Sequence, residues 1–204
     1  MKRENVVLLA RARHEASAQL EVGLKYLTGS GGFPRHESLA LQYLDHDGIR
    51  DTNDVDRIVS EHLPLERLVS LEREATLVRA AESGSAEAQF KLAVWQFLGH
   101  GSVRGCARWL TAAERSGHGK ARLVASDLLR SKRPQEGALL EALQKHSSMS
   151  LDAICLAAAA QATQHNDVYR LDHCCTSRCS ALRPSRPSQP NWSSASCRRR
   201  QTHR

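Results

Sequence analysis

Hydrophobic positions recur along most of this chain at the spacing of amphipathic helices, and one helical pattern occurs twice. Residues 18–31 read AQLEVGLKYLTGSG, and residues 88–101 read AQFKLAVWQFLGHG. In both segments small and aliphatic residues share one helix face, and two glycines follow at equivalent positions. Glycine permits the positive φ that ends a helix, so each segment predicts a helix, a turn and then a second helix.

A weaker form of the same pattern continues through the chain. AAESG at 80–84 leads into the second copy, and AAERSG at 112–117 leads into another helical stretch. A helix pair of this length cannot bury its apolar faces alone and must stack on its neighbours. The sequence therefore predicts an all-α fold, an α/α superhelical repeat solenoid of helix–turn–helix units over residues 1–165. The expected units are about 14–47, 51–84, 85–117 and 118–146, followed by a capping helix at 149–165.

The unit between the two good copies is degenerate and lacks the glycine turn. Thr52 and its neighbours can cap a helix that runs to about His62, and Pro64 suits the first turn of the next helix. Apolar residues then recur at helical spacing, which predicts one continuous second helix. Its expected buried residues are Leu65, Leu68, Leu71, Ala75 and Val78.

The two good copies share an order of small, apolar and turn residues. In the segment 86–117 these residues are Ala86, Ala88, Gln89, Leu92, Gly99, Gly101, Val103, Trp109, Leu110 and Gly117. In the segment 16–44 they are Ala16, Ala18, Gln19, Gly23, Tyr26, Gly29, Gly31, Ala40 and Leu44. This order resembles the Sel-like repeats, which are relatives of the tetratricopeptide repeats. The resemblance implies a superhelix that works as an adaptor or scaffold for other proteins.

The chain departs from the Sel-like pattern at several places. Gln96 stands where the pattern has Tyr, and the unit from 118 has RSKRPQ in place of the glycine turn. Some disulfide-rich Sel-like proteins bind β-lactams, which makes a β-lactam-binding enzyme one alternative function. Such proteins staple each repeat with a disulfide, whereas the helical part of this chain holds only Cys106 and Cys155, at unrelated repeat positions. The expected function is therefore non-enzymatic.

The C-terminal segment 173–204 has a different composition from the rest. It contains seven of the 29 basic residues, all arginine, and no Asp or Glu, so the remaining 22 basic residues balance the 22 acidic ones. With little apolar content, this tail is expected to be disordered. Three interpretations of this tail compete. It could serve as a basic arm for nucleic acid or as a metal site at His173, Cys174, Cys175 and Cys179, or it could be the product of a shifted reading frame. We favour the shifted frame, because adjacent cysteines would compete for one ion and no second ligand pair follows.

Motifs for catalysis, cofactors and metals are missing from the helical part. GSGG at 29–32 lacks the Lys-Ser/Thr of a phosphate-binding loop, and neither G-x-S-x-G nor H-E-x-x-H occurs. We expect no catalytic residue, no cofactor and no metal. An acidic group fails the spacing of a calcium loop and is expected to be a solvated loop and helix start: Asp45, Asp47, Asp51, Asp54 and Asp56.

A partner-binding surface is expected on the first helix of each good copy. The residues that face the second helix of the first unit are Ala18, Gln19, Val22, Gly23 and Tyr26. Apolar residues on the opposite face either pack on a neighbouring repeat or line a groove for a protein or peptide partner. In the groove interpretation Trp95 is the anchor, because aromatic residues dominate interface energies. The predicted polar rim consists of Glu21, Lys25, Lys91 and Arg122.

The N-terminus predicts no secretory signal. Only the short apolar run VVLLA separates the basic start from the next arginine, and no run approaches the length of a membrane span. The expected location is cytoplasmic.

Overall fold

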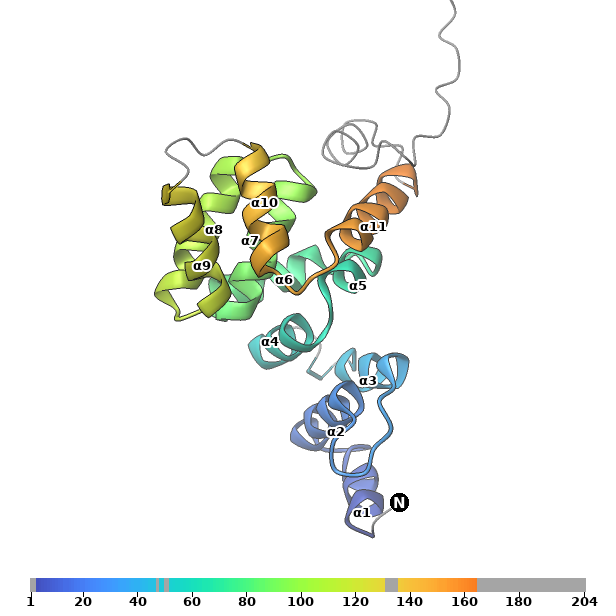
Figure 1. Ribbon diagram of the computed structural model, residues 1–204. Helices are drawn as coiled ribbons and strands as arrows, with labels where there is room; N and C mark the ends of the chain where they lie inside the picture. The colour runs from blue at the N-terminus through green and yellow to red at the C-terminus, as the bar shows by residue number, and fades with distance from the viewer. Residues whose placement is uncertain (1–2, 47, 50–51, 131–135, 165–204) are drawn as a thin grey trace, which may run out of the picture.

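The computed structural model describes residues 3–46, 48–49, 52–130 and 136–164, and all the regular structure in them is helical (Figure 1). The predicted all-α class is therefore confirmed for these residues, while the segment 173–204 lies outside them. The described helices are α1 (Arg3–Arg11), α2 (Ala16–Thr28), α3 (Glu37–Leu44), α4 (Asn53–His62), α5 (Leu65–Ser70), α6 (Glu74–Glu82), α7 (Ala86–Leu98), α8 (Val103–Arg115), α9 (Gly119–Arg130), α10 (Glu136–His146) and α11 (Leu151–Gln164).

The two good sequence copies form the helix pairs α2–α3 and α7–α8. The first pair is closely packed because Gly23 has no side chain: a Cβ there would lie 2.6 Å from Leu44 Cγ. Gly29 ends α2 in the left-handed conformation with φ 71°, as expected. Gly99 does not, since its φ is −86° and the positive φ falls at Gly101 instead. Gly99 instead leaves room for Trp95, because the ring of Trp95 occupies the position that a Cβ of residue 99 would take.

The degenerate unit contains three helices where the sequence predicted two. Thr52 caps α4 as expected, its hydroxyl accepting from Val55 N. The chain then breaks between α5 and α6, and Glu72 adopts a positive φ of 56°. Arg73 N donates to Leu68 O across this break, which satisfies a carbonyl at the end of α5. One continuous helix was therefore wrong, since a turn can be closed by backbone bonds without glycine or proline.

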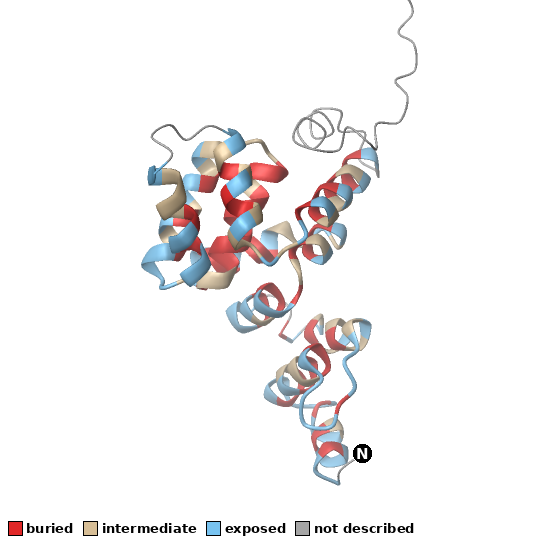
Figure 2. Ribbon diagram, viewed as in Figure 1, coloured by how far each residue is buried: buried red, intermediate tan, exposed pale blue. Residues whose placement is uncertain are grey.

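Helix α7 occupies the centre of the larger helical group. It contacts α4, α6 and α8, and Figure 2 shows it buried along most of its length. Helices α8, α9 and α10 follow one another in contact, while α1, α2 and α3 form the N-terminal end of the molecule (Figure 1). A helix, α11, is present where the sequence predicted the last one, and its main contact is with α5 rather than with the preceding helix α10.

Ion pairs connect helices that are far apart in the sequence. Arg79 on α6 donates to both carboxylate oxygens of Asp56 on α4, at 2.6 and 2.9 Å. Arg67 on α5 binds Glu37 on α3 differently, because two of its nitrogens donate to one carboxylate oxygen, at 2.6 and 2.9 Å. Asp56 is 1 % exposed, so the expectation of a solvated acidic group is wrong at this position. A carboxylate buried this deeply requires a cation, and Arg79 provides it.

The described helices include none with the length and apolar character that crossing a membrane requires. The longest of them, α11, has 14 residues.

Gly23→Ala is expected to destabilise the fold, although alanine is the better helix former. Alanine gains about 0.5–1 kcal/mol of helix propensity, but overpacking a filled core costs about 1–3 kcal/mol. The added methyl would overlap the buried Leu44 side chain near its base, where it cannot turn aside. Urea denaturation measures the change, and Gly137→Ala is the matched control because nothing lies within 4 Å of its Cβ position. A Gly23→Ala protein as stable as the control would show that α2 and α3 separate easily.

Candidate partner-binding surface

Glu21 and Lys25 lie on the accessible face of α2. Their side chains form an ion pair of 2.8 Å one helical turn apart, and Lys25 Nζ also lies 5.7 Å from the ring centre of Phe33. Glu21 is half-exposed and Lys25 is partly buried. Both side chains therefore reach the surface.

Trp95 is not an accessible anchor in this fold. Its residue exposure is 1 %, and it surrounds a small cavity of about 10 Å³ together with Leu65, Leu68 and Gln161. The edge of its ring faces His100 at a centroid distance of 5.5 Å. The α5 and α11 residues around it show that Trp95 packs on neighbouring elements, which was the alternative interpretation of this face.

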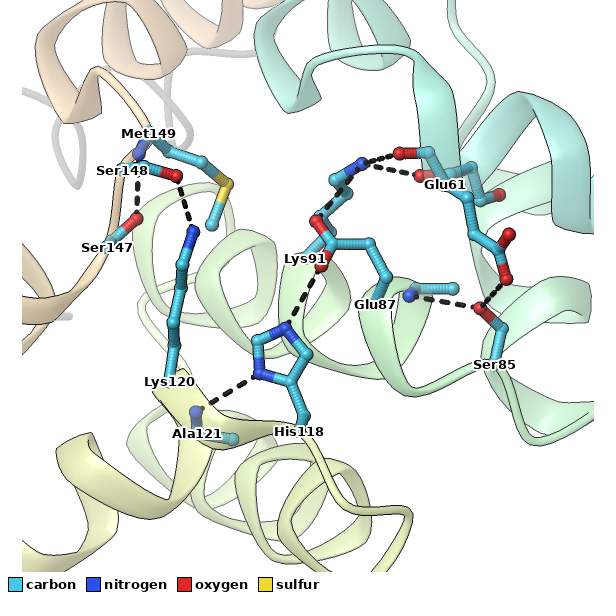
Figure 3. A network of polar contacts seen from close by, with 12 residues as sticks. Glu61, Ser85, Glu87, Lys91, His118, Lys120, Ala121, Ser147, Ser148 and Met149 are labelled. Carbon is cyan, nitrogen blue, oxygen red and sulfur yellow. Dashed lines mark hydrogen bonds and ion pairs between the residues drawn. The ribbon is translucent and has the colours of Figure 1, made fainter.

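Lys91 is also buried, at 4 % exposure, and it holds the end of another helix. Its ammonium donates to the carbonyls of Ser60, Glu61 and Leu63 at 2.6, 3.0 and 3.0 Å. Figure 3 shows the contact with Glu61. Ser60 and Glu61 lie in the last turn of α4 and Leu63 follows it, so these carbonyls have no partner within the helix. Burial lowers the pKa of Lys91, while the ion pair with Glu87, 3.4 Å away, opposes this effect. The predicted role of Lys91 in a polar rim is therefore wrong, since its charge is used inside the molecule.

Glu87 extends this network from α7 to the start of α9. His118 Nδ1 accepts the backbone N–H of Ala121 at 3.1 Å, so in the neutral ring Nε2 carries the proton and donates to Glu87 at 3.0 Å (Figure 3). The hydrogen bond from His118 lowers the pKa of Glu87 to about 2. The His118 ring also stacks on Phe90, with centroids 4.5 Å apart. The network joins α4, α7 and α9.

Arg122 is exposed on α9, at the other end of the molecule from α2 in Figure 1. The structure thus leaves Glu21, Lys25 and Arg122 accessible but does not bring them into one surface. With Lys91 and Trp95 buried, the five predicted residues do not form a single site.

A surface groove lies instead on the first helix pair, and we call it the α1–α3 groove. Its volume is about 380 Å³, within the range of roughly 300–1,000 Å³ in which protein clefts hold ligands. The rings of Tyr26 and Tyr43 stack in it with centroids 6.0 Å apart and an interplanar angle of 14°. The groove is lined by Ala12, Arg13, Gln19, Tyr26, Leu39, Gln42, Tyr43 and His46.

The polar side chains of the α1–α3 groove are not used to hold the fold. Within the described part of the chain, Arg13, Gln19 and Gln42 make no side-chain hydrogen bond or ion pair. Sequence reasoning placed Gln19 and Tyr26 on a packing face and gave the other polar residues no role. The Ala-Gln pair in both copies was the one sequence feature that could have indicated the groove. The same polar residue at equivalent positions can have different surroundings in the two copies.

A second groove, between α8 and α9, has a volume of about 390 Å³ and is largely apolar. Leu110, Leu128 and Leu129 line it, and Leu129 is 84 % exposed. The described residues of its lining include the carboxylate of Glu114 but no amide, so they carry less information about a ligand than those of the first groove.

Two further histidines and one cysteine serve structural roles. His100 pairs with Glu74 at 2.9 Å and His146 with Asp127 at 2.8 Å, each joining two elements of the fold. Burial raises the pKa of Cys106 to about 12, so its thiol is not ionised at neutral pH and is a poor nucleophile. Among the residues that the structure describes, no group of three or more His, Cys, Asp or Glu could hold a metal ion.

Comparisons with protein-family models, with curated proteins and with solved structures found no match for this chain. The resemblance to the Sel-like repeats therefore rests on the residues of the two copies. It supports a proposal about function and does not establish membership of the family.

Lys91→Met is expected to destabilise the protein by about 2 kcal/mol or more, because three buried carbonyls lose a charge-assisted hydrogen bond. Methionine keeps the length of the side chain and removes the cost of burying a charge, which makes this a conservative test. Urea denaturation of both proteins gives the difference. Lys25→Met is the control, and its cost should stay within about 0.5 kcal/mol since the ion pair it removes is exposed to solvent. Equal losses in the two variants would contradict the role of Lys91 as a helix cap.

Glu87→Gln is expected to make the free energy of unfolding depend less on pH in the acidic range. In the unfolded chain this carboxyl has the ordinary pKa of 4.5, and in the fold the value is about 2. Between these values the unfolded state binds more protons, so the stabilisation is complete above pH 4.5 and is lost as the pH falls towards 2. Denaturation at a series of pH values measures the loss. His118→Leu should weaken the acid dependence in the same way, because its hydrogen bond is the main cause of the shift; an unchanged slope in both variants would contradict it.

Proposed function

We propose that this chain is a non-enzymatic scaffold of Sel-like helical repeats, stacked as a solenoid, that binds protein partners. The observation that carries the proposal is the α1–α3 groove, whose polar side chains take no part in holding the fold. The repeated Ala-Gln helix and its glycine turn support it, because stacked helix pairs present extended surfaces for binding.

Binding is favoured over catalysis by the way the fold uses its titratable groups. Both nitrogens of His118 are engaged, one by a backbone N–H and the other by Glu87, so neither can take a proton from a substrate. Lys91 is enclosed by carbonyls, and Cys106 is buried with a raised pKa. General acid–base and nucleophilic catalysis need such groups within reach of a substrate.

A second candidate function is nucleic-acid association through the tail at 173–204. Its seven arginines, without any acidic residue, favour contact with phosphates. This function predicts binding that falls steeply with salt and disappears when the tail is removed. The scaffold function predicts partner binding that survives its removal.

Site-specific photo-crosslinking separates these functions. A benzophenone amino acid replaces Gln42 in the α1–α3 groove, and in a matched control it replaces the exposed Glu82 on α6. We expect one protein to be crosslinked from position 42 and not from position 82. Isothermal titration of that purified partner should give the same affinity, within about twofold, for the full chain and for a chain without 173–204. Crosslinking that requires the tail and is abolished by moderate salt would contradict the scaffold function.

A further inference from the structure

Gln19 and Gln89 occupy the same position in the two copies, but among the described residues only the side chain of Gln89 has hydrogen-bond partners. Gln89 Nε2 donates to the carbonyl of Ala81 at 3.0 Å, and its Oε1 accepts from the hydroxyl of Ser116 at 2.9 Å. Ala81 lies at the end of α6, the helix that precedes α7. In the second copy, therefore, this glutamine binds a main-chain carbonyl and a hydroxyl donor at the same time.

The chain before Gln19 explains why the same bond is not made in the first copy. The connection between α1 and α2 spans 12–15, one residue more than the connection 83–85 before α7. Arg11, the equivalent of Ala81, already accepts the N–H groups of His14 and Glu15, each at 3.0 Å. A carbonyl has two lone pairs, so this oxygen has none left for the amide of Gln19. The carbonyl of Ala81 accepts the longer bond from Gly84 N–H, at 3.2 Å, and binds the amide of Gln89 as well.

The amide of Gln19 consequently lines the groove without a partner among the described residues. Most of the Gln19 side chain is buried, at 5 % residue exposure, but its amide atoms are not enclosed by the protein. They can therefore form hydrogen bonds with a ligand that enters the groove. An amide offers donors and an acceptor together, so it can exchange two hydrogen bonds with one peptide group. Gln42, which is exposed on α3 in the same groove, offers a second amide.

The charge of the groove defines the ligand further. Arg13 and His46 are exposed at the groove, and none of the described residues that line it is Asp or Glu. Arg13 has no ion pair among the described residues, whereas Arg11, two positions earlier, is bound to Glu15. A guanidinium with free donors is suited to bind a carboxylate. The stacked rings of Tyr26 and Tyr43 add an apolar surface, on which apolar side chains of the ligand can pack between its acidic residues.

We propose that the α1–α3 groove binds an extended acidic peptide segment of a partner protein. Gln19 exchanges hydrogen bonds with the main chain of that segment, and Arg13 binds one of its carboxylates. This inference rests on the proposed scaffold function, and it specifies the chemistry of the partner.

Fluorescence anisotropy with three labelled peptides tests the proposal on the full chain. The probes are GEVEVEG, GQVQVQG and GKVKVKG, which differ only in charge and favour an extended conformation. We expect the acidic peptide to bind at least about tenfold more tightly than the other two. Arg13→Glu and Gln19→Met should each weaken its binding by about tenfold, while the matched control Arg122→Glu on α9 should leave it unchanged. Arg13 is exposed, so its variant keeps the test valid even where Gln19→Met impairs folding.

Several outcomes would overturn the inference. These are equal binding of the acidic and lysine peptides, no effect of Arg13→Glu, displacement of the peptide by a twelve-nucleotide single-stranded DNA, and self-association that Arg13→Glu abolishes. The last two would assign the groove to nucleic acid and to a second copy of the chain. Failure of the acidic peptide with continued crosslinking from position 42 would refute the acidic ligand alone. Failure of the crosslinking as well would refute the scaffold function.

Discussion

The capping of α4 by the ammonium of Lys91 is the contact on which the centre of this fold depends. The last carbonyls of a helix carry partial negative charge, and burying them without donors is unfavourable. Because Lys91 lies on the central helix α7, its three hydrogen bonds fix where α4 ends against it. Pro64 and α5 begin directly after that end, and α5 brings Leu65 and Leu68 to the ring of Trp95. The contact between α5 and α11 follows from the same placement.

Equivalent positions in the two copies have opposite surroundings, and this difference locates the accessible surface. Lys91 and Trp95 correspond to Glu21 and Lys25, which form an ion pair on the surface of α2. In the third unit this face is covered by α4, α5 and neighbouring residues, so the side chains there serve packing and capping. In the first unit the face remains partly open. The accessible form of this face therefore lies on the N-terminal helix pair rather than on α7.

The sequence predicted what depends on local pattern and missed what depends on distant neighbours. Helical spacing, the cap at Thr52 and the turn at Gly29 were correct, because each is decided by residues within a few positions. The break at Glu72 escaped prediction since backbone bonds alone close it. The burial of Trp95 and Lys91 could not be predicted from periodicity. Periodicity distinguishes the two faces of α7, but it does not say which other helices will cover each face. The α1–α3 groove was missed for the same reason.

The asymmetry between Gln19 and Gln89 bears on whether the open face is a binding site or a packing defect. The amide of Gln19 is accessible from the groove and holds no described element of the fold, so an aliphatic residue could take its place without loss of a contact. If the open face were only a packing defect, the residues around Gln19 would have no chemical property in common. Instead Gln19 shares its groove with a second amide, two stacked tyrosines and an unpaired guanidinium. Local violations of packing rules that are grouped in this way are characteristic of functional sites, and the group as a whole favours a ligand.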